Sequence, residues 1–482
     1  MTHHPRGLTT LFFTEMWERF SYYGMRALLT LYMLAAPAAG GLGFTAHRSG
    51  LVYGTYTLSV YVLSILGGFI ADNFVGARRA VLWAVFIIAM GHFTLALESQ
   101  SSFFAGLALV ALGSGLLKPN MSSMVGGLYE ADDPRREAGF TIFYMGINVG
   151  ALAAPIVTGF LAQSARWKDC LSAMGFDPVR SWHWGFAAAG VGMTIGLVVY
   201  VATGRRIAHV GLPPAPGTPR PWGRLVLVLA GIAAFLVYVT KSDEPGFQWM
   251  RSAYVIAPVA GAVIFGFQKT VDARRLAAVF VLFVAAMVFW MIFEQAGSTI
   301  AIFGDRLTRN SIFGLTFPSS WFQSVNPFFV IALAPIYSWL WVKLGDRQPS
   351  SPLKFVFGLV FLGLSFALMV PAARLTGEGR VSPLWIVGLF LLQTLGELCL
   401  SPVGLSAMTR LAPPRLVGMI LSIWFLADAL GNKVAGLFAG EFRSDPRWLA
   451  AFFGWQAAIV AGCAVLLLLL VPWVKRLMGG IR

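Results

Sequence analysis

The residues that could do chemistry in this sequence are charged side chains inside apolar, helix-length segments. The first such segment reads EMWERFSYYGMR, and one arc of about 100° on this helix carries Glu15, Glu18, Arg19, Tyr22 and Arg26. A charge at the centre of a bilayer costs about 2.5–3.5 kcal/mol, so we expect these side chains to line a polar cavity or to pair. An interfacial amphipathic helix is the alternative, which the apolar run 27–36 disfavours because it completes a membrane span.

A second cation, Lys118, lies in the fourth apolar segment and is followed by Pro119, which can bend a helix. We expect Glu15 or Glu18 to be its counter-ion, because a buried ion pair is costly to desolvate but much more costly to break. The alternative is a lysine whose ammonium snorkels to the membrane interface.

The second half of the chain is rich in acids within its apolar segments. Polar groups there lie one helical turn apart or close in sequence: Glu294 with Trp290 and Ser298, Glu397 with Ser401, Trp424 with Asp428 and Asn432, and Gln323 with Asn326. A small zwitterion could bridge the two halves, with its carboxylate at Arg19 and Lys118 and its ammonium at Glu397. Acids inside a membrane are functional by default, and a structural role is the alternative.

The composition indicates that membrane-spanning helices carry these residues. Of the 482 residues, 57% are hydrophobic and 12% are charged, whereas soluble domains carry about 25% charged residues. Runs long enough to cross a bilayer lie near 11–36, 49–73, 79–98, 103–128, 139–165, 184–204, 224–240, 252–268, 276–303, 320–344, 354–373, 383–411, 415–440 and 448–474. The sequence therefore predicts an all-α polytopic membrane protein with fourteen spans. It excludes a membrane β-barrel, whose strands alternate with period two, and also a soluble enzyme.

The net charge of +15 is explained by membrane orientation, and we expect no nucleic-acid partner. Basic pairs lie in alternate loops, at 78–79, 135–136, 205–206, 274–275 and 475–476. Such loops are cytoplasmic in membrane proteins, so an even number of spans predicts that both termini are cytoplasmic. The sequence has no HExxH motif and no Gly-rich phosphate loop, and its three cysteines are too few for a clustered metal site. We expect no metal site and no catalytic residues.

The proline-rich stretch 205–223 divides the chain after six predicted helices. The predicted domains are an N-terminal six-helix bundle (1–204), a linker with an inserted helical hairpin (205–273) and a C-terminal six-helix bundle (274–482). The hairpin has no ionisable residue at its helix centres, so we expect it to face lipid without a chemical role.

Several motifs together are typical of one family. EMWERFSYYG has the form ExxERFxYYG and resembles the first-helix signature of the proton-dependent oligopeptide transporters, a family of the major facilitator superfamily. The resemblance continues through GGFIADNFVGAR, GLLKPN, FYMGINVG, FWMIFEQ, FQSVNP, GELCLSP and WFLADALGN, over essentially the whole chain. The two extra helices and the short loop at 374–383 resemble the bacterial members. The implied fold is two six-helix bundles plus two inserted helices.

The resemblance also implies roles for individual residues. Proton coupling is implied for Glu15, Glu18, Arg19, Lys118 and Glu294. Peptide binding is implied for Arg19, Tyr22, Tyr23, Arg26, Tyr61, Lys118, Asn148, Asn326, Glu397, Ser401, Trp424 and Asp428. An outer gate is implied for Arg26, His47 and Asp305. Asp428 departs from the family pattern, in which a small polar residue such as serine is usual.

We therefore expect a proton-coupled symporter that imports di- and tripeptides by alternating access. It would need no cofactor and would be driven by the proton gradient. It would work as a monomer in the lipid bilayer of the cell membrane. The alternative within transport is another small solute, such as nitrate or a peptide-like drug. The intact ExxER motif with Lys118 and Glu397 favours a zwitterion over a simple anion. A membrane receptor or an intramembrane enzyme is a further alternative, but the sequence has no evident signalling domain or catalytic dyad.

Overall fold

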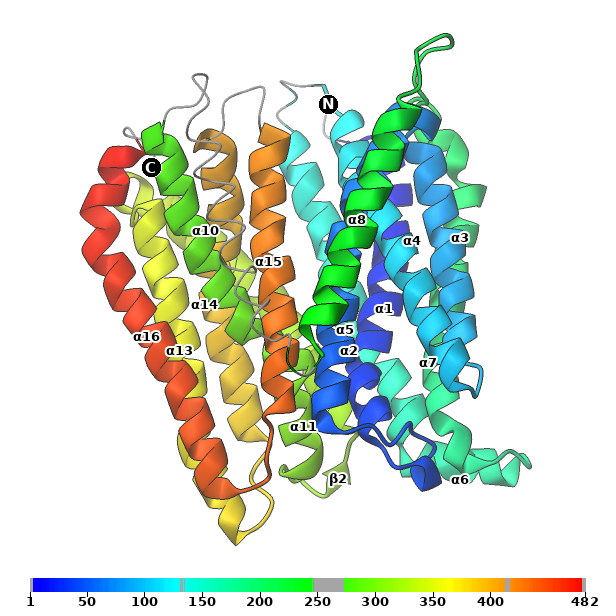
Figure 1. The fold of residues 1–482 in the computed structure, drawn as a ribbon, viewed down its shortest axis with the longest axis vertical. Helices are drawn as coiled ribbons and strands as arrows, with labels where there is room; N and C mark the ends of the chain where they lie inside the picture. Colours follow the sequence, from blue (N-terminus) through cyan, green and yellow to red (C-terminus); the bar gives the residue numbers. More distant parts are fainter. Residues whose placement is uncertain are drawn as a thin grey trace. The chain divides into compact units, whose positions relative to one another are not determined.

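The protein is built almost entirely from α-helices (Figure 1). The computed structural model describes residues 3–130, 133, 135–244, 246, 273–411 and 417–478. In the first half the helices are α1 (Arg6–Leu34), α2 (Ala46–Ile70, prolonged by the π-helical turn η2, Ala71–Val75), α3 (Ala77–Leu95), α4 (Gln100–Gly127), α5 (Arg136–Gln163), α6 (Ala165–Ala173), α7 (Ser181–Ala202) and α8 (Trp222–Ser242).

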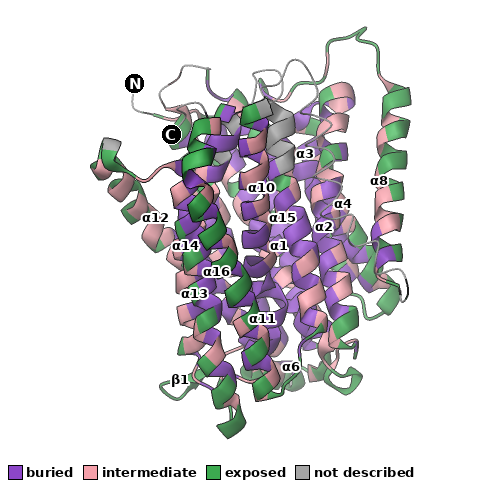
Figure 2. Cartoon of the chain, turned by 60° about the vertical axis from the view of Figure 1, so that its left-hand side comes forward, coloured by how far each residue is buried: buried purple, intermediate pink, exposed green. Residues whose placement is uncertain are grey.

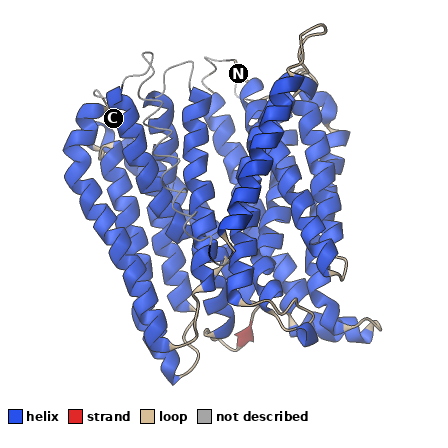
Figure 3. Ribbon diagram, in the orientation of Figure 1, coloured by secondary structure: helices blue, strands red, loops and turns tan. Residues whose placement is uncertain are grey.

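The second half contains longer helices and several short turns. Its α-helices are α10 (Ala273–Phe293), α11 (Thr299–Arg306), α12 (Val325–Leu344), α13 (Ser351–Leu375), α14 (Leu384–Leu411), α15 (Val417–Gly440) and α16 (Pro446–Leu477). The 3-10 turns η6 (Glu294–Gly297) and η7 (Ser319–Ser324) precede α11 and α12. Among the described residues, the strands are the two-residue β1 (Ser311–Ile312) and β2 (Leu315–Thr316), which form one small hairpin (Figure 3).

The predicted helical membrane architecture is confirmed. Within the described ranges, eleven helices are long and apolar enough to cross a membrane. Two further helices match predicted spans although they are not among the eleven. α1 has 29 residues, about 43 Å of helix, and is left out because of its charges. α15 coincides with the predicted span 415–440. Of the fourteen predicted spans, 252–268 lies outside the described residues. The short helix α6 was not predicted, because its nine residues form only about two and a half turns of a mixed polar sequence.

The chain forms two compact units. Unit 1 comprises Met1–Thr45, Thr55–Tyr238 and Phe313–Phe328, and unit 2 comprises Ala46–Gly54, Val239–Ile312 and Phe329–Arg482. Each unit includes a short segment from the other half of the sequence. The three predicted domains are continuous stretches of sequence, whereas each compact unit combines several segments of the chain. The domain boundaries therefore stay a prediction.

Small residues bring the helices of unit 1 into close contact. A Cβ atom at Gly150 of α5 would lie 3.0 Å from the backbone nitrogen of Phe20 on α1. One turn further along α1, the carbonyl of Gly24 accepts a hydrogen bond of 3.2 Å from the hydroxyl of Thr158. Close helix packing through glycine is typical of membrane proteins, and here it fixes the face that α1 presents to α5.

The turn η7 packs on α5 within unit 1. Gln163 at the end of α5 donates to the Ser319 hydroxyl over 3.0 Å. The Trp321 indole and the Ser324 hydroxyl donate to the α5 carbonyls of Ile156 and Leu152 over 3.1 and 2.8 Å. These bonds anchor the segment that leads directly into Asn326.

In unit 2, α15 contacts α10, and α13 contacts both α14 and α16. Gly50 and Gly54 of α2 lie against Gly436 of α15, where a side chain would collide with backbone. α8 differs from the core helices, since it is mostly exposed along its length (Figure 2). This exposure agrees with the lipid-facing position expected for the first helix of the hairpin.

Candidate functional site: buried charges in the two units

The charged face of α1 is a buried ion-pair cluster. The Nε atom of Arg19 lies 2.9 Å from an oxygen of Glu15 and 2.6 Å from an oxygen of Glu18. All three side chains are buried, and Glu18 is 0% exposed. Three of the charges expected to pair or to line a cavity therefore pair within their own helix.

Tyr22 lies between two cations. The guanidinium carbon of Arg19 is 5.5 Å from the centroid of the Tyr22 ring, and the ammonium of Lys118 on α4 is also 5.5 Å from it. Lys118 lies closer still to Tyr61 of α2, at 4.0 Å from that ring. Cation–π contacts of this kind contribute about 0.5–2 kcal/mol each. The structure thus brings together residues of three helices that the sequence placed in one site, while the pairing of Lys118 with a glutamate stays a prediction.

The aromatic contacts extend along α1 to Arg26. Tyr22 and Tyr23 meet edge to face with centroids 5.3 Å apart, and the Arg26 guanidinium lies 6.0 Å from the Tyr23 ring. Asn148 on α5 is buried, and its amide donates to the Tyr144 carbonyl one turn earlier over 3.0 Å. It therefore lies on the same tightly packed pair of helices as the ion-pair cluster.

In unit 2, Glu294 lies at an interruption between two helices. It is 6% exposed and begins the turn η6, which separates α10 from α11. Broken helices often form the binding sites of transporters, because they free backbone polar groups. Asp305 is half-buried near the end of α11, and His47 is exposed at the start of α2, beside Gly440.

The remaining candidates of unit 2 lie on α14 and α15. Glu397 and Ser401 are half-buried one turn apart on α14, which contains Pro402. On α15, Trp424 is 2% exposed and Asp428 is half-buried. The Asn432 amide donates to an Asp428 carboxylate oxygen over 2.8 Å, so two of the polar groups expected one helical turn apart on this helix are in contact.

One buried ion pair was missed by the sequence analysis. Lys433 on α15 is 0% exposed and pairs with Asp243, which directly follows α8. The prediction that the inserted hairpin has no chemical role was therefore incomplete, because the end of its first helix supplies a buried counter-ion. A lysine inside an apolar span requires an anion, and that requirement was the available signal.

Apolar membrane-spanning helices that bury several cations and acids are typical of polytopic membrane transporters. Within the described residues, no three His, Cys, Asp or Glu side chains are grouped as metal ligands. The chain belongs to the POT family, since the family model PTR2, described as POT family, matches residues 78–448.

Individual relatives agree with this membership. The chain is 38% identical to the peptide transporter YePEPT of Yersinia enterocolitica, covering 99% of this chain and 96% of that protein. A crystal structure of a peptide transporter POT in complex with alafosfalin is 39% identical over 99% of this chain and 96% of that chain, with a TM-score of 0.88. A POT family transporter in complex with 5-aminolevulinic acid is 32% identical over 98% of each chain, with a TM-score of 0.85. The predicted fold class and family resemblance are confirmed.

Proposed function

We propose that this protein is a proton-coupled symporter that imports di- and tripeptides by alternating access. Its membership of the POT family and its likeness to a protein named as a peptide transporter support this function. The proton gradient would supply the free energy, and no cofactor would be required.

The observation that carries the proposal is the balanced charge of the α1 cluster when Lys118 of α4 is counted with it. Glu15, Glu18, Arg19 and Lys118 contribute two acids and two bases, and Tyr22 joins the two bases through its ring. A proton on Glu18 would leave one positive charge in excess. A peptide carboxylate bound at Arg19 and Lys118 would restore the balance. Proton uptake and peptide binding would then favour each other, which is the requirement for symport.

The acids of unit 2 would serve the other end of the peptide. Glu397 would bind the amino group, and Glu294, at the helix interruption, would be a further proton-coupling acid. The rest of the peptide site would be formed by Tyr22, Tyr23, Arg26, Tyr61, Asn148, Asn326, Ser401, Trp424 and Asp428. Arg26, His47 and Asp305 would form the outer gate. The partial exposure of Glu397, Ser401 and Asp428 supports contact with a solute.

We further propose a monomer in the cell membrane with both termini in the cytoplasm. The basic pairs that follow alternate spans support this orientation. The moving bodies would be the bundles 1–204 and 274–482, joined by the linker and hairpin 205–273.

Uptake of labelled dialanine into proteoliposomes under an imposed proton gradient tests the function. We expect accumulation that disappears when an ionophore collapses the gradient, and that unlabelled dipeptides suppress. Uptake that is indifferent to the gradient would refute proton coupling. Competition by nitrate or a peptide-like drug, with none by dipeptides, would favour the alternative of another small solute.

A further inference from the structure

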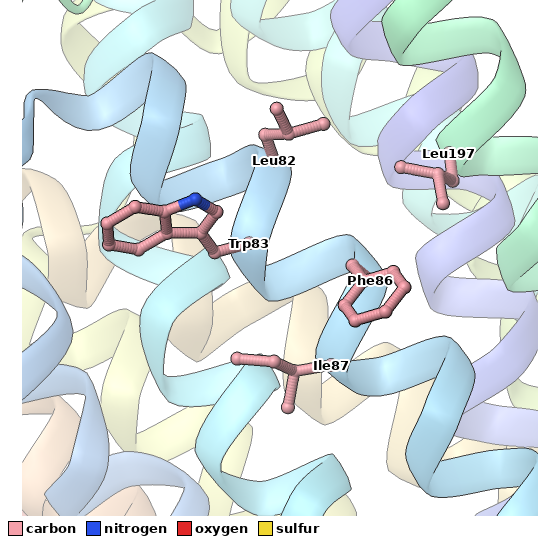
Figure 4. Close-up of a pocket in the computed structure, with 5 residues that line it drawn as sticks. All are labelled: Leu82, Trp83, Phe86, Ile87 and Leu197. Carbon is pink, nitrogen blue, oxygen red and sulfur yellow. The ribbon is translucent and has the colours of Figure 1, made fainter.

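An apolar hollow opens on the side of unit 1 between α3 and α7. It measures about 350 Å³ and is lined by Leu82, Trp83, Phe86 and Ile87 of α3 and Leu197 of α7 (Figure 4). Trp83 and Phe86 are 48% and 55% exposed, so the hollow faces the surroundings of the helix bundle.

The depth of the hollow matches the acyl region of one leaflet. Leu82 and Ile87 lie five and ten residues into α3, which begins at Ala77. At 1.5 Å per residue the hollow lies about 8–15 Å below the start of the helix. Half of the hydrocarbon core of a bilayer is about 15 Å thick, so a lipid chain is the occupant available at this depth.

Two arginines lie at the shallow end of the hollow. Arg79 precedes Trp83 by one turn of α3, and Arg205 lies three residues after Ala202, the last residue of α7, in the turn Gly204–Ile207. Both side chains are exposed, and no hydrogen bond or ion pair joins either one to another described residue. By contrast, Arg135 in another loop pairs with Asp133 at 2.7 Å.

Three hydrogen bonds bring the two arginine-bearing segments together. The Tyr200 hydroxyl on α7 donates to the Arg78 carbonyl over 2.9 Å. The Arg78 guanidinium donates to the Ala208 carbonyl over 3.2 Å, and its backbone nitrogen donates to the Gly211 carbonyl over 3.0 Å. The end of α7 and the segment after it are therefore held at the start of α3, beside Arg79.

We propose that the α3–α7 hollow is a binding site for an anionic phospholipid. One acyl chain lies against Trp83, Phe86 and Leu197, and the phosphate lies between Arg79 and Arg205. Guanidinium groups bind phosphate oxygens in a bidentate manner, and basic pockets between membrane helices bind anionic headgroups. The site is independent of the peptide site, so the failure of either proposal leaves the other intact.

Native mass spectrometry of the purified protein with added phosphatidylglycerol or phosphatidylcholine tests the site. We expect the parent to retain phosphatidylglycerol preferentially, and Arg79→Gln/Arg205→Gln to lose that preference, by about 5-fold for each arginine. Lys475→Gln/Arg476→Gln is the matched control, since it removes two exposed charges at the end of α16. An equal loss of the preference for phosphatidylglycerol in both double variants would show general charge attraction and overturn the proposal. Equal retention of the two lipids by the parent would also overturn it.

Two further arms test the acyl chain. Phe86→Ala removes an exposed ring, so the fold should be kept while retention of long-chain phosphatidylglycerol falls and that of a short-chain form does not. Inorganic phosphate at millimolar concentration should not displace the long-chain lipid. Complete displacement by phosphate would show an anion site without a lipid chain and would refute the lipid assignment.

Discussion

Glu18→Gln gives the sharpest test of proton coupling, because it imitates a protonated carboxyl without changing the shape of the side chain. Arg19 keeps Glu15 at 2.9 Å in this variant and loses only the charge at 2.6 Å. Of the four cluster residues, one acid and two bases then remain charged. The variant therefore holds permanently the charge state that the parent would reach only by taking up a proton.

The magnitude follows from the burial of the cluster. Glu18 is 0% exposed, and one uncompensated buried charge costs about 3–5 kcal/mol. At about 1.4 kcal/mol per tenfold, this biases a two-state equilibrium by more than a hundredfold. We expect Glu18→Gln to abolish accumulation of dipeptide under a proton gradient in liposomes. Exchange of labelled for unlabelled dipeptide should continue, because Glu397 and the other residues proposed to bind the peptide are unchanged.

Glu98→Gln is the matched control. Glu98 pairs with Arg180 at 3.0 Å, but both side chains are about half exposed, and such pairs contribute at most about 1 kcal/mol. This variant should accumulate dipeptide as the parent does. If Glu18→Gln also concentrates dipeptide against its gradient, the cluster on α1 is not the coupling site, and Glu294 becomes the principal candidate.

Four further outcomes are expected. Lys118→Ala should abolish gradient-driven accumulation, and normal accumulation by liposomes containing it would exclude a role in coupling. Glu397→Gln should weaken the binding of dipeptides sharply and that of N-acetylated dipeptides much less, as measured by competition. Equal losses for both ligands would refute the proposal that Glu397 binds the peptide amino group. Asp428→Ser should keep the fold, because Asn432 also donates to the Asp428 carbonyl over 3.1 Å, and should change the preference between cationic and anionic dipeptides; unchanged competition would make Asp428 structural. Lys433→Met should lower the melting temperature in detergent, because leaving Asp243 as a buried charge without its cation costs about 3–5 kcal/mol of folding free energy. Adding Asp243→Asn should restore much of the lost stability, and no recovery would show that the two charges are not coupled.

The spans were predictable because each one needs about 20 apolar residues, which leave an unmistakable pattern in the sequence. The pairing on α1 follows the same local logic, since Glu15 and Arg19 are four residues apart and share one face. The aromatic environment of Lys118 has no such local signal, because Tyr61 comes from a different helix. The inclusion of Tyr61 in the predicted site depended on the family resemblance.

Long-range pairs and helix interruptions escaped prediction for a physical reason. Asp243 and Lys433 are 190 positions apart, and each adjoins or lies within a segment whose hydropathy alone predicts a plain span. The turn at Glu294 contains no proline, so its sequence predicted a continuous helix over 276–303. In both cases tertiary packing decides the outcome. Lys433 indicates that an anion is needed, but the sequence does not show which acid supplies it.

The charge count of the α1 cluster also bears on the class of substrate. In the proposed mechanism, a proton on Glu18 leaves one positive charge, and any small anion at Arg19 and Lys118 would balance it. Such an anion has no amino group to bind at Glu397, the half-buried acid of α14 proposed for that role. A zwitterion would use both proposed positions at once, since its carboxylate balances the protonated cluster and its ammonium binds Glu397. Dipeptides and tripeptides carry these two charges at their ends, so they satisfy a site of this design better than nitrate does.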